Sequence, residues 1–459
     1  MWIIIVIFAI ILRWLHSWLI KPHQYWKEKG IPYVKPSPIV GNVGPNLLHK
    51  KSFADLLQEW YTSYSEYRYV GFYQFSSPTL IIRDPELIKQ IVIKEFDTFP
   101  DHRAFVSEDM DPLWSKNLFA MKGGTKWQDM RSTLSPSFTS SKLKMMFDLM
   151  KNCSKQFVSY VNKQEGLAVI EMKDIFTRFT NDVIATTAFG VSCNSLDNPE
   201  NEFFLMGKDA TNFSGIRNLK FFLYALSPTF MKALDIGIFS KEVSSFFRKV
   251  IKENIKIREE KNIVRPDMLN LLMEARKGRL KLEDSTILNK PELTDDDITA
   301  QALVFFIGGF DSVSNLMCFA AYELAVNPDM QTRLREEIIS TIKRDNNELT
   351  YENLMGMKYL EMFISETLRK WPPGIIGDRV SVKSFTVQPR LPEEKAVTLD
   401  PGTNIWIPIY AMHRDPNYFP DPEKFDPERF NEENKRNIQT FTYLPFGAGP
   451  RNCIGARFA

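Results

Sequence analysis

The sequence has few cysteines, almost no net charge and no internal repeat. Its four cysteines, Cys153, Cys193, Cys318 and Cys453, are too far apart along the chain for a CxxC metal knuckle or a dense disulfide framework. We therefore expect a reducing compartment, with the first three as small buried apolar side chains. The formal net charge of +2 gives no general basic field, so we expect no nucleic-acid partner.

The chain also has little sequence apolar enough to cross a bilayer, and we expect such a segment only at the N-terminus. Met1–Leu12 is unbroken apolar sequence, and residues 13–20 extend it to spanning length. Lysines follow, beginning at Lys21, and basic flanks favour the cytoplasmic side. Residues 1–20 are thus predicted to be a membrane anchor. A cleaved signal peptide or a helix lying in the membrane interface are the alternatives.

Beyond the anchor, the patterns predict a mainly helical protein with a small β region. Residues 21–45 are predicted to be a linker, stiff and helix-free from Pro32 to Pro45 because it is rich in proline and glycine. Tyr69–Gln74 and Thr79–Ile82 are typical of a β-hairpin. Most of the chain after Pro85 has helical periodicity, so residues 46–459 are predicted to form one large domain.

One segment near the C-terminus has the features of a thiolate site. In Phe446-Gly-Ala-Gly-Pro-Arg451-Asn-Cys453-Ile-Gly455, glycines stand on both sides of the cysteine. They let the backbone turn closely around the sulfur and direct N–H groups at it, which stabilises a thiolate ligand. The residues from Gly455 are predicted to open a helix whose N-terminus faces the sulfur. A buried cysteine in a glycine-rich turn is the alternative.

Two further pairs have helical spacing. Glu366 and Arg369 stand at i, i+3 on one helix face, where they can pair. Trp127 and Arg131 stand at i, i+4, so both side chains emerge on the same side of a helix. Taken singly, the Glu–Arg pair is common and usually a solvated surface pair, and the Trp–Arg pair is a weak signal of function.

A long apolar helix pattern contains Gly308, Gly309, Asp311 and Ser312. Paired glycines weaken a helix interior by roughly 1 kcal/mol each, so we expect them to have a role that requires the missing side chain. Close packing of a neighbouring helix is one reason, and a groove that leaves room for a ligand is the other. An acid beside a hydroxyl in such a groove can deliver protons.

Together these motifs resemble the cytochrome P450 family. The Cys453 loop matches Phe-x-x-Gly-x-Arg-x-Cys-x-Gly in full, and the other motifs follow in the family's order. The resemblance implies that an arginine of the Phe425–Phe430 segment joins Glu366 and Arg369 in a buried Glu–Arg–Arg network. Two departures occur in the helix motif, where Gly308 replaces the commoner Ala and Ser312 replaces Thr. The segments around Trp371 and Asp84 are most similar to microsomal insect members that metabolise xenobiotics.

The resemblance implies the family's fold, with haem b held between two long helices. It implies Cys453 as the iron ligand, with Trp127, Arg131, Arg379 and Arg451 at the haem propionates. Phe446 and Gly309 also belong to the implied haem site, and Asp311 and Ser312 to the proton path. Apolar residues implied at the substrate pocket are Phe105, Phe119, Ile307, Gly308 and Ile375.

The implied activity is monooxygenation of a lipophilic small molecule with O2 and NADPH. The implied partners are NADPH-cytochrome P450 reductase, cytochrome b5 as a further candidate, and the endoplasmic reticulum membrane, with the catalytic domain on its cytoplasmic side. Arg131, Arg451 and Arg457 are expected near the reductase-docking face. A peroxide isomerase or dehydratase, or a non-catalytic haem protein, are the alternatives.

Two expectations stay open at this stage. The chain stops at Ala459, six residues after Cys453, whereas family members continue, so we expect a partial sequence. The phenylalanine-rich stretch from Phe203 to Phe247 is expected either to dip into the membrane or to belong to the core.

Overall fold

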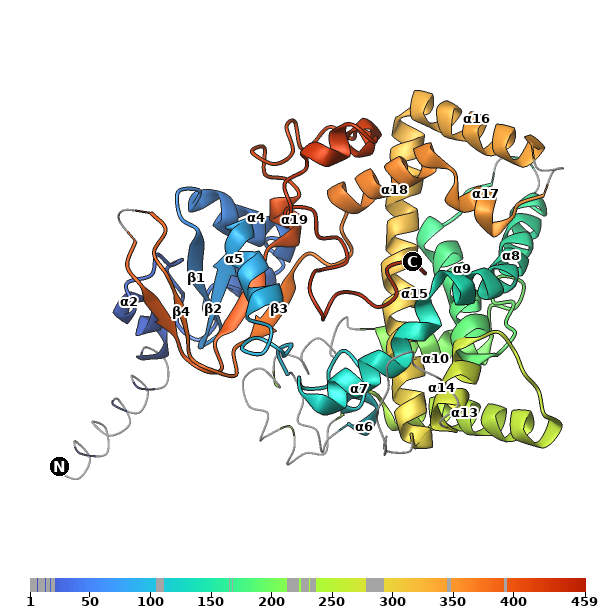
Figure 1. Cartoon of the computed structure of the whole chain (residues 1–459), viewed down its shortest axis with the longest axis horizontal. Coiled ribbons are helices and arrows are strands. Elements are labelled where there is room, and N and C mark those ends of the chain that lie inside the picture. The colour runs from blue at the N-terminus through green and yellow to red at the C-terminus, as the bar shows by residue number, and fades with distance from the viewer. Residues whose placement is uncertain are drawn as a thin grey trace. The chain divides into compact units, whose positions relative to one another are not determined.

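The structure is a computed structural model. It describes residues 21–104, 111–164, 166, 168–212, 237–277, 293–344, 348–391 and 394–459, with isolated positions between these ranges. Helices predominate and strands are few, as expected (Figure 1). Apart from three isolated positions, the predicted anchor at residues 1–20 lies outside the described residues, so it stays a prediction.

The chain forms two compact units. Unit 1 comprises Met1–Arg103, Arg369–Phe425 and Arg429–Asn452, and unit 2 comprises Ala104–Leu368, Asp426–Glu428 and Cys453–Ala459. Unit 1 contains all the described strands, and unit 2 is built from helices.

Unit 1 is organised around a four-stranded sheet with the order β1-β2-β6-β3. The strands β1 (Tyr69–Gln74) and β2 (Ser77–Ile82) form the predicted hairpin, although β2 begins two residues before the predicted Thr79. Strand β6 (Asn404–Ile407) pairs in parallel with β2 and antiparallel with β3 (Gly377–Val380). A separate hairpin joins β4 (Phe385–Val387) and β5 (Val397–Leu399).

Short helices surround these strands. They are η1 (Lys21–Gln24), α2 (Tyr25–Glu28), α3 (Gly44–Leu47), α4 (Phe53–Ser63), α5 (Pro85–Lys89), η2 (Gln90–Lys94), α19 (Ile409–Met412), η5 (Pro427–Phe430, across the unit boundary) and η6 (Asn434–Asn437). The prediction of a helix-free segment up to Pro45 is wrong at its end, because α3 begins at Gly44. Pro45 lies in the first helical turn, where no backbone N–H is needed.

Part of the predicted linker belongs to the core of unit 1. Trp26 is fully buried, and its indole N–H donates to the Phe72 carbonyl at 3.0 Å. Gly71 leaves room for this ring, since a Cβ there would lie 2.5 Å from it. The segment after the predicted anchor is therefore fixed to the sheet by packing as well as by hydrogen bonds.

Unit 2 is built around one long helix, α15 (Asp295–Val326), which runs through the unit in Figure 1. A capping box of Thr294 and Asp297 starts it, and the sequence Thr294-Asp-Asp-Asp297 is typical of a helix start with acids at its positive end. It packs on α9 (Met172–Ile184), α10 (Glu202–Thr211) and α13 (Lys241–Lys261). The remaining elements are α6 (Pro112–Ser115), α7 (Thr125–Leu134), η3 (Ser135–Phe138), α8 (Ser140–Asn162), η4 (Ala185–Phe189), α14 (Met268–Arg276), α16 (Pro328–Arg344), α17 (Tyr351–Met355) and α18 (Lys358–Lys370).

By length and composition, α15 is also the one described helix that is apolar enough to cross a membrane. The expectation that only the N-terminus qualifies is therefore wrong on that criterion. The packing of α15 on α9, α10 and α13 provides another reason for its apolar character.

Aromatic side chains form the core beside α15. Phe203 and Phe247 are buried and contact Phe306 of α15 at centroid distances of 5.7 Å. Phe306 stacks in turn on Phe310. At these positions the phenylalanine-rich stretch is core. Most of residues 213–236 lie outside the described part of the chain.

Candidate active site

Cys453 is the first residue of the last segment of unit 2, and its surroundings have opposing effects on the pKa of its thiol. Surrounding protein atoms raise the pKa of the thiol, whereas the Gly455 N–H and the charge of Arg131 lower it. The side chain itself is exposed. After it, the Ala459 N–H donates to the Gly455 carbonyl at 2.9 Å, which forms the first turn that the sequence predicts. The cysteine thus has a backbone donor and an arginine beside it.

Helix α7 carries Trp127 and Arg131. Arg131 is half-buried, and burial lowers its pKa while the nearby Cys453 raises it. Trp127 is buried, and its indole N–H donates to the Leu118 carbonyl at 3.2 Å. Because an indole has a single N–H, a bond to another acceptor would replace this one. The arginine, more than the tryptophan, is placed to meet an anion here.

The paired glycines of α15 have different surroundings. A Cβ on Gly309 would lie 2.6 Å from Ile184 Cδ1 on α9, so this glycine allows close helix packing. A Cβ on Gly308 would meet nothing within 4 Å. The open position predicted from the motif is therefore Gly308, and the packing alternative describes Gly309.

Asp311 and Ser312 do not bond to each other. Asp311 pairs with Lys173 of α9 at 2.8 Å, and the same ammonium donates to Ser314 Oγ at 2.8 Å. The Ser312 hydroxyl donates to the Gly308 carbonyl one turn earlier. Ser312 and Gly308 thus share the open face, while Asp311 is directed toward α9. A relay between Asp311 and Ser312 needs a water molecule or a rotamer change.

In unit 1, the segment before the cysteine is a tight loop. Gly447 and Gly449 have φ of 70° and 77°, and a Cβ on Gly449 would lie 2.1 Å from the Val92 carbonyl oxygen, so the turn requires glycine. Phe446 is half-buried. Arg451 is 8% exposed and its Nε donates to the Pro100 carbonyl at 2.7 Å. Arg451 is thus buried, whereas Arg457 is exposed, and their place near a docking face stays a prediction.

Arg379 of β3 holds the same loop from another side. Its Nη2 donates to the Ala448 carbonyl at 3.2 Å, and its Nε is buried without a partner. Burial lowers the pKa of Arg379, and Asp378 opposes this shift. The side chain is 4% exposed, so it presents a buried cation with unused hydrogen-bonding capacity.

A neighbouring cluster was not predicted from the sequence. Asp378 accepts a bond from His102 Nδ1 at 2.8 Å and another from the Arg103 N–H at 2.7 Å. These residues are separated by more than half of the chain, and no local pattern marks them. They fix the segment after Phe99 to the strand that carries Arg379.

Glu366 and Arg369 are both fully buried, which excludes a solvated surface pair. Glu366 accepts the Asp426 N–H at 2.8 Å within unit 2. In unit 1, Arg369 donates to the carbonyls of His413 and Pro422, each at 2.7 Å. Both side chains therefore organise the backbone of the segments that precede the cysteine loop, which is a structural role.

The substrate-pocket candidates are only partly described. Phe119 is 45% exposed, and Ile307 and Ile375 are half-buried. Phe105 lies outside the described residues. Among these candidates, Gly308 has the open position noted above.

Comparison with known proteins agrees with this arrangement of motifs. A family model described as Cytochrome P450 matches residues 31–459. Cytochrome P450 9e2 of Blattella germanica is 48% identical over all of this chain and 89% of its own length. The probable cytochrome P450 9f2 of Drosophila melanogaster is 43% identical over all of this chain and 90% of its own, and cytochrome P450 6k1 of Blattella germanica is 39% identical over 95% and 83%. The chain belongs to the cytochrome P450 family.

Proposed function

We propose that this chain inserts one oxygen atom from O2 into a lipophilic small molecule, using electrons from NADPH that a reductase delivers. The family uses haem with a cysteine thiolate as iron ligand, and its members are monooxygenases. The observation that carries the proposal for this chain is the environment of Cys453, which has a backbone donor and Arg131 beside it.

The residues fit an anionic, iron-binding macrocycle. Arg379 is a buried cation whose Nε lacks a partner, and Arg131 is half-buried. Both are suited to carboxylates such as haem propionates. In this proposal Cys453 ligates iron, while Arg131, Arg379, Arg451 and Trp127 hold the propionates. Bound haem supplies the electron and oxygen chemistry that side chains lack.

The other site residues would control space and protons. Gly308 keeps the open face of α15 clear, and Gly309 brings α15 close to α9. Phe446 would pack against the cofactor. Asp311 and Ser312 would transfer protons from solvent. Lys173 would pair with the Asp311 carboxylate between proton transfers.

The partners follow from the family. Its members generally work with redox partners and lipophilic substrates, and insect relatives are typically microsomal. For this chain we propose NADPH-cytochrome P450 reductase, with cytochrome b5 as a second electron donor. The location would be the endoplasmic reticulum membrane, with residues 1–20 as the anchor and the catalytic domain on the cytoplasmic side.

The ligand assignment can be tested by substitution of Cys453. Reduced, CO-treated protein should show the long-wavelength Soret band that a thiolate ligand produces, and Cys453→Ser should lose it because a neutral hydroxyl cannot donate the same charge. Cys318→Ser is the matched control and should keep the band. Retention of the band by Cys453→Ser would refute the assignment.

The activity can be tested with the purified reductase. Consumption of NADPH with formation of an oxygenated product from a lipophilic compound supports the monooxygenase. Turnover of a peroxide substrate without reductase would indicate an isomerase or dehydratase instead. Haem binding with no turnover in either assay would indicate a non-catalytic haem protein.

A further inference from the structure

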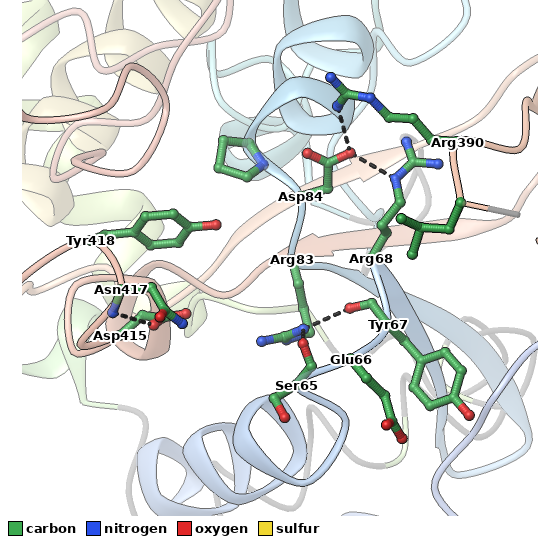
Figure 2. Close-up of a pocket in the computed structure, with 12 residues that line it drawn as sticks. Ser65, Glu66, Tyr67, Arg68, Arg83, Asp84, Arg390, Asp415, Asn417 and Tyr418 are labelled. Atoms are coloured by element: carbon green, nitrogen blue, oxygen red, sulfur yellow. Dashed lines mark hydrogen bonds and ion pairs between the residues drawn. The ribbon is translucent and has the colours of Figure 1, made fainter.

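Unit 1 contains a polar pocket of about 420 Å³ that the proposed oxygenation does not use. Figure 2 shows it, with side chains contributed by the segment before β1, the segment after β2, the loop after β4 and the segment after α19. This volume lies in the range of small-ligand sites. The lining residues that matter here are Arg83, Arg390, Ser65, Tyr67, Asn417 and Tyr418.

Arg83 is a buried cation with unused donors. It is 8% exposed, and its guanidinium stacks on Tyr61 at 4.3 Å. Nη1 donates to the carbonyls of Tyr64, Ser65 and Tyr67 at 3.0, 2.7 and 2.6 Å, while Nε has no partner. The carbonyls use Nη1 only and Nε is buried, so the structural role of Arg83 leaves Nη2 available to a ligand.

Of the three carboxylates that line the pocket, Asp84 and Asp415 have partners of their own, and Glu66 is exposed to solvent. Asp84 pairs with Arg68 at 2.8 Å and with Arg390 at 3.3 Å. Asp415 accepts the Tyr61 hydroxyl at 2.6 Å and the Asn417 N–H at 2.9 Å. Arg83 forms no ion pair with a described residue, and its guanidinium lies over the Tyr61 ring. A buried charge of this kind is costly without a counter-ion.

The pocket is also lined by neutral and cationic donors. Tyr67 and Tyr418 carry hydroxyls, Asn417 carries an amide, and Arg390 stands at the rim with its side chain 57% exposed (Figure 2). A phosphate group has several acceptor oxygens and matches such a set better than a carboxylate, which has two. We propose that this pocket binds the phosphate group of a small phosphate ester, whether it belongs to a soluble compound or to a phospholipid headgroup.

The test uses the full chain in detergent or vesicles, with amide hydrogen exchange as the readout. Inorganic phosphate and glycerol phosphate should slow exchange in residues 65–68 and 415–418. Vesicles of phosphatidic acid should do the same if the source is a headgroup, and galactolipid vesicles, which lack phosphate, should not. Protection by soluble esters alone would identify a free ligand, and protection by phosphatidic acid alone a headgroup.

Substitutions separate the pocket from general charge. Arg390→Gln should weaken phosphate binding about tenfold, because one charged donor is lost. Arg436→Gln removes an exposed charge elsewhere in unit 1 and should have no effect. Arg83→Lys keeps a cation for the three carbonyls but loses the second guanidinium nitrogen, so it should fold and bind weakly. Absence of protection with every probe, or equal affinity in all four proteins, would overturn the proposal.

Discussion

Ser312 has a hydroxyl on the open face of α15, where it donates to the Gly308 carbonyl. Without the γ-methyl of threonine it has more rotamers, so part of the population should point away from a ligand on that face. We expect Ser312→Thr to raise the ratio of product to NADPH consumed, and Ser312→Ala to lower it and release peroxide. Peroxide measured alongside product checks this.

The control for Ser312 is Ser154 of α8, whose hydroxyl also donates to a carbonyl one turn earlier, at 3.1 Å. Ser154→Thr and Ser154→Ala should leave the coupling ratio unchanged. Equal coupling in all the Ser312 variants would mean that water alone carries the protons.

Asp378 links acid stability to the cluster next to Arg379. Burial alone would raise the pKa of this carboxyl, but the bonds from His102 and the Arg103 N–H, with the charge of Arg379, hold it below the usual 3.8. A carboxyl of this kind stabilises the folded protein at pH values above the pKa that it has in the unfolded chain. This contribution is lost as the pH falls through the pKa that it has in the folded protein. We therefore expect a loss of stability below about pH 4.

Asp378→Asn should remove this contribution. At pH 7 the variant should be destabilised by about 1–3 kcal/mol through weaker hydrogen bonds. From pH 5 to pH 2 its stability should fall less steeply than that of the wild type, as measured by denaturant unfolding at each pH. Asp97→Asn, at an exposed position, should follow the wild-type curve. A variant with the wild-type pH dependence would show that Asp378 does not carry it.

At the scale of helices, Gly308 and Gly309 form a matched pair. Gly308→Ala adds a methyl where nothing lies within 4 Å, so it should stabilise the chain by up to about 1 kcal/mol through helix propensity. Gly309→Ala should destabilise it, because the new Cβ would lie 2.6 Å from Ile184 Cδ1. Thermal unfolding of both variants measures the difference.

Ile184→Val provides the check on the Gly309 contact. It removes the Cδ1 atom that the new methyl would meet, so the double variant Gly309→Ala, Ile184→Val should recover part of the lost stability. Strictly additive effects would show that the two positions do not touch.

Elements with local signals could be predicted from the sequence. The β1–β2 hairpin follows from two short strand-like runs separated by Ser-Ser-Pro, and the start of α15 follows from Thr294 and Asp297. Local pattern could not show which of the two glycines faces α9, because that depends on where Ile184 packs. Nor could it pair His102 with Asp378, since 276 residues separate them. The same limit applies to Arg83, whose missing counter-ion is visible only in three dimensions.

At the scale of the molecule, unit 1 is assembled from distant segments. Its core joins Trp26, Tyr73 and Leu80 from the N-terminal part to Phe385, Leu399 and Ile405 from the C-terminal part. A fragment of residues 21–103 contains β1 and β2 but lacks the strands and apolar side chains that cover them. We expect this fragment to unfold without a cooperative transition, as followed by circular dichroism on heating. A cooperative transition in the fragment, like that of the full chain, would contradict the assignment of one shared core.

The pairing of β2 with β6 also affects how the protein is made. Thr79–Ile81 pair with Asn404–Trp406, so the ribosome releases one partner long before the other. At ~5–20 residues per second, a separation of roughly 300 residues leaves the β2 edge without its neighbour for about 15–60 s. An open strand edge can pair with other chains during that time. The β2 edge of a nascent chain is therefore open to such pairing until residues 404–406 have been synthesised.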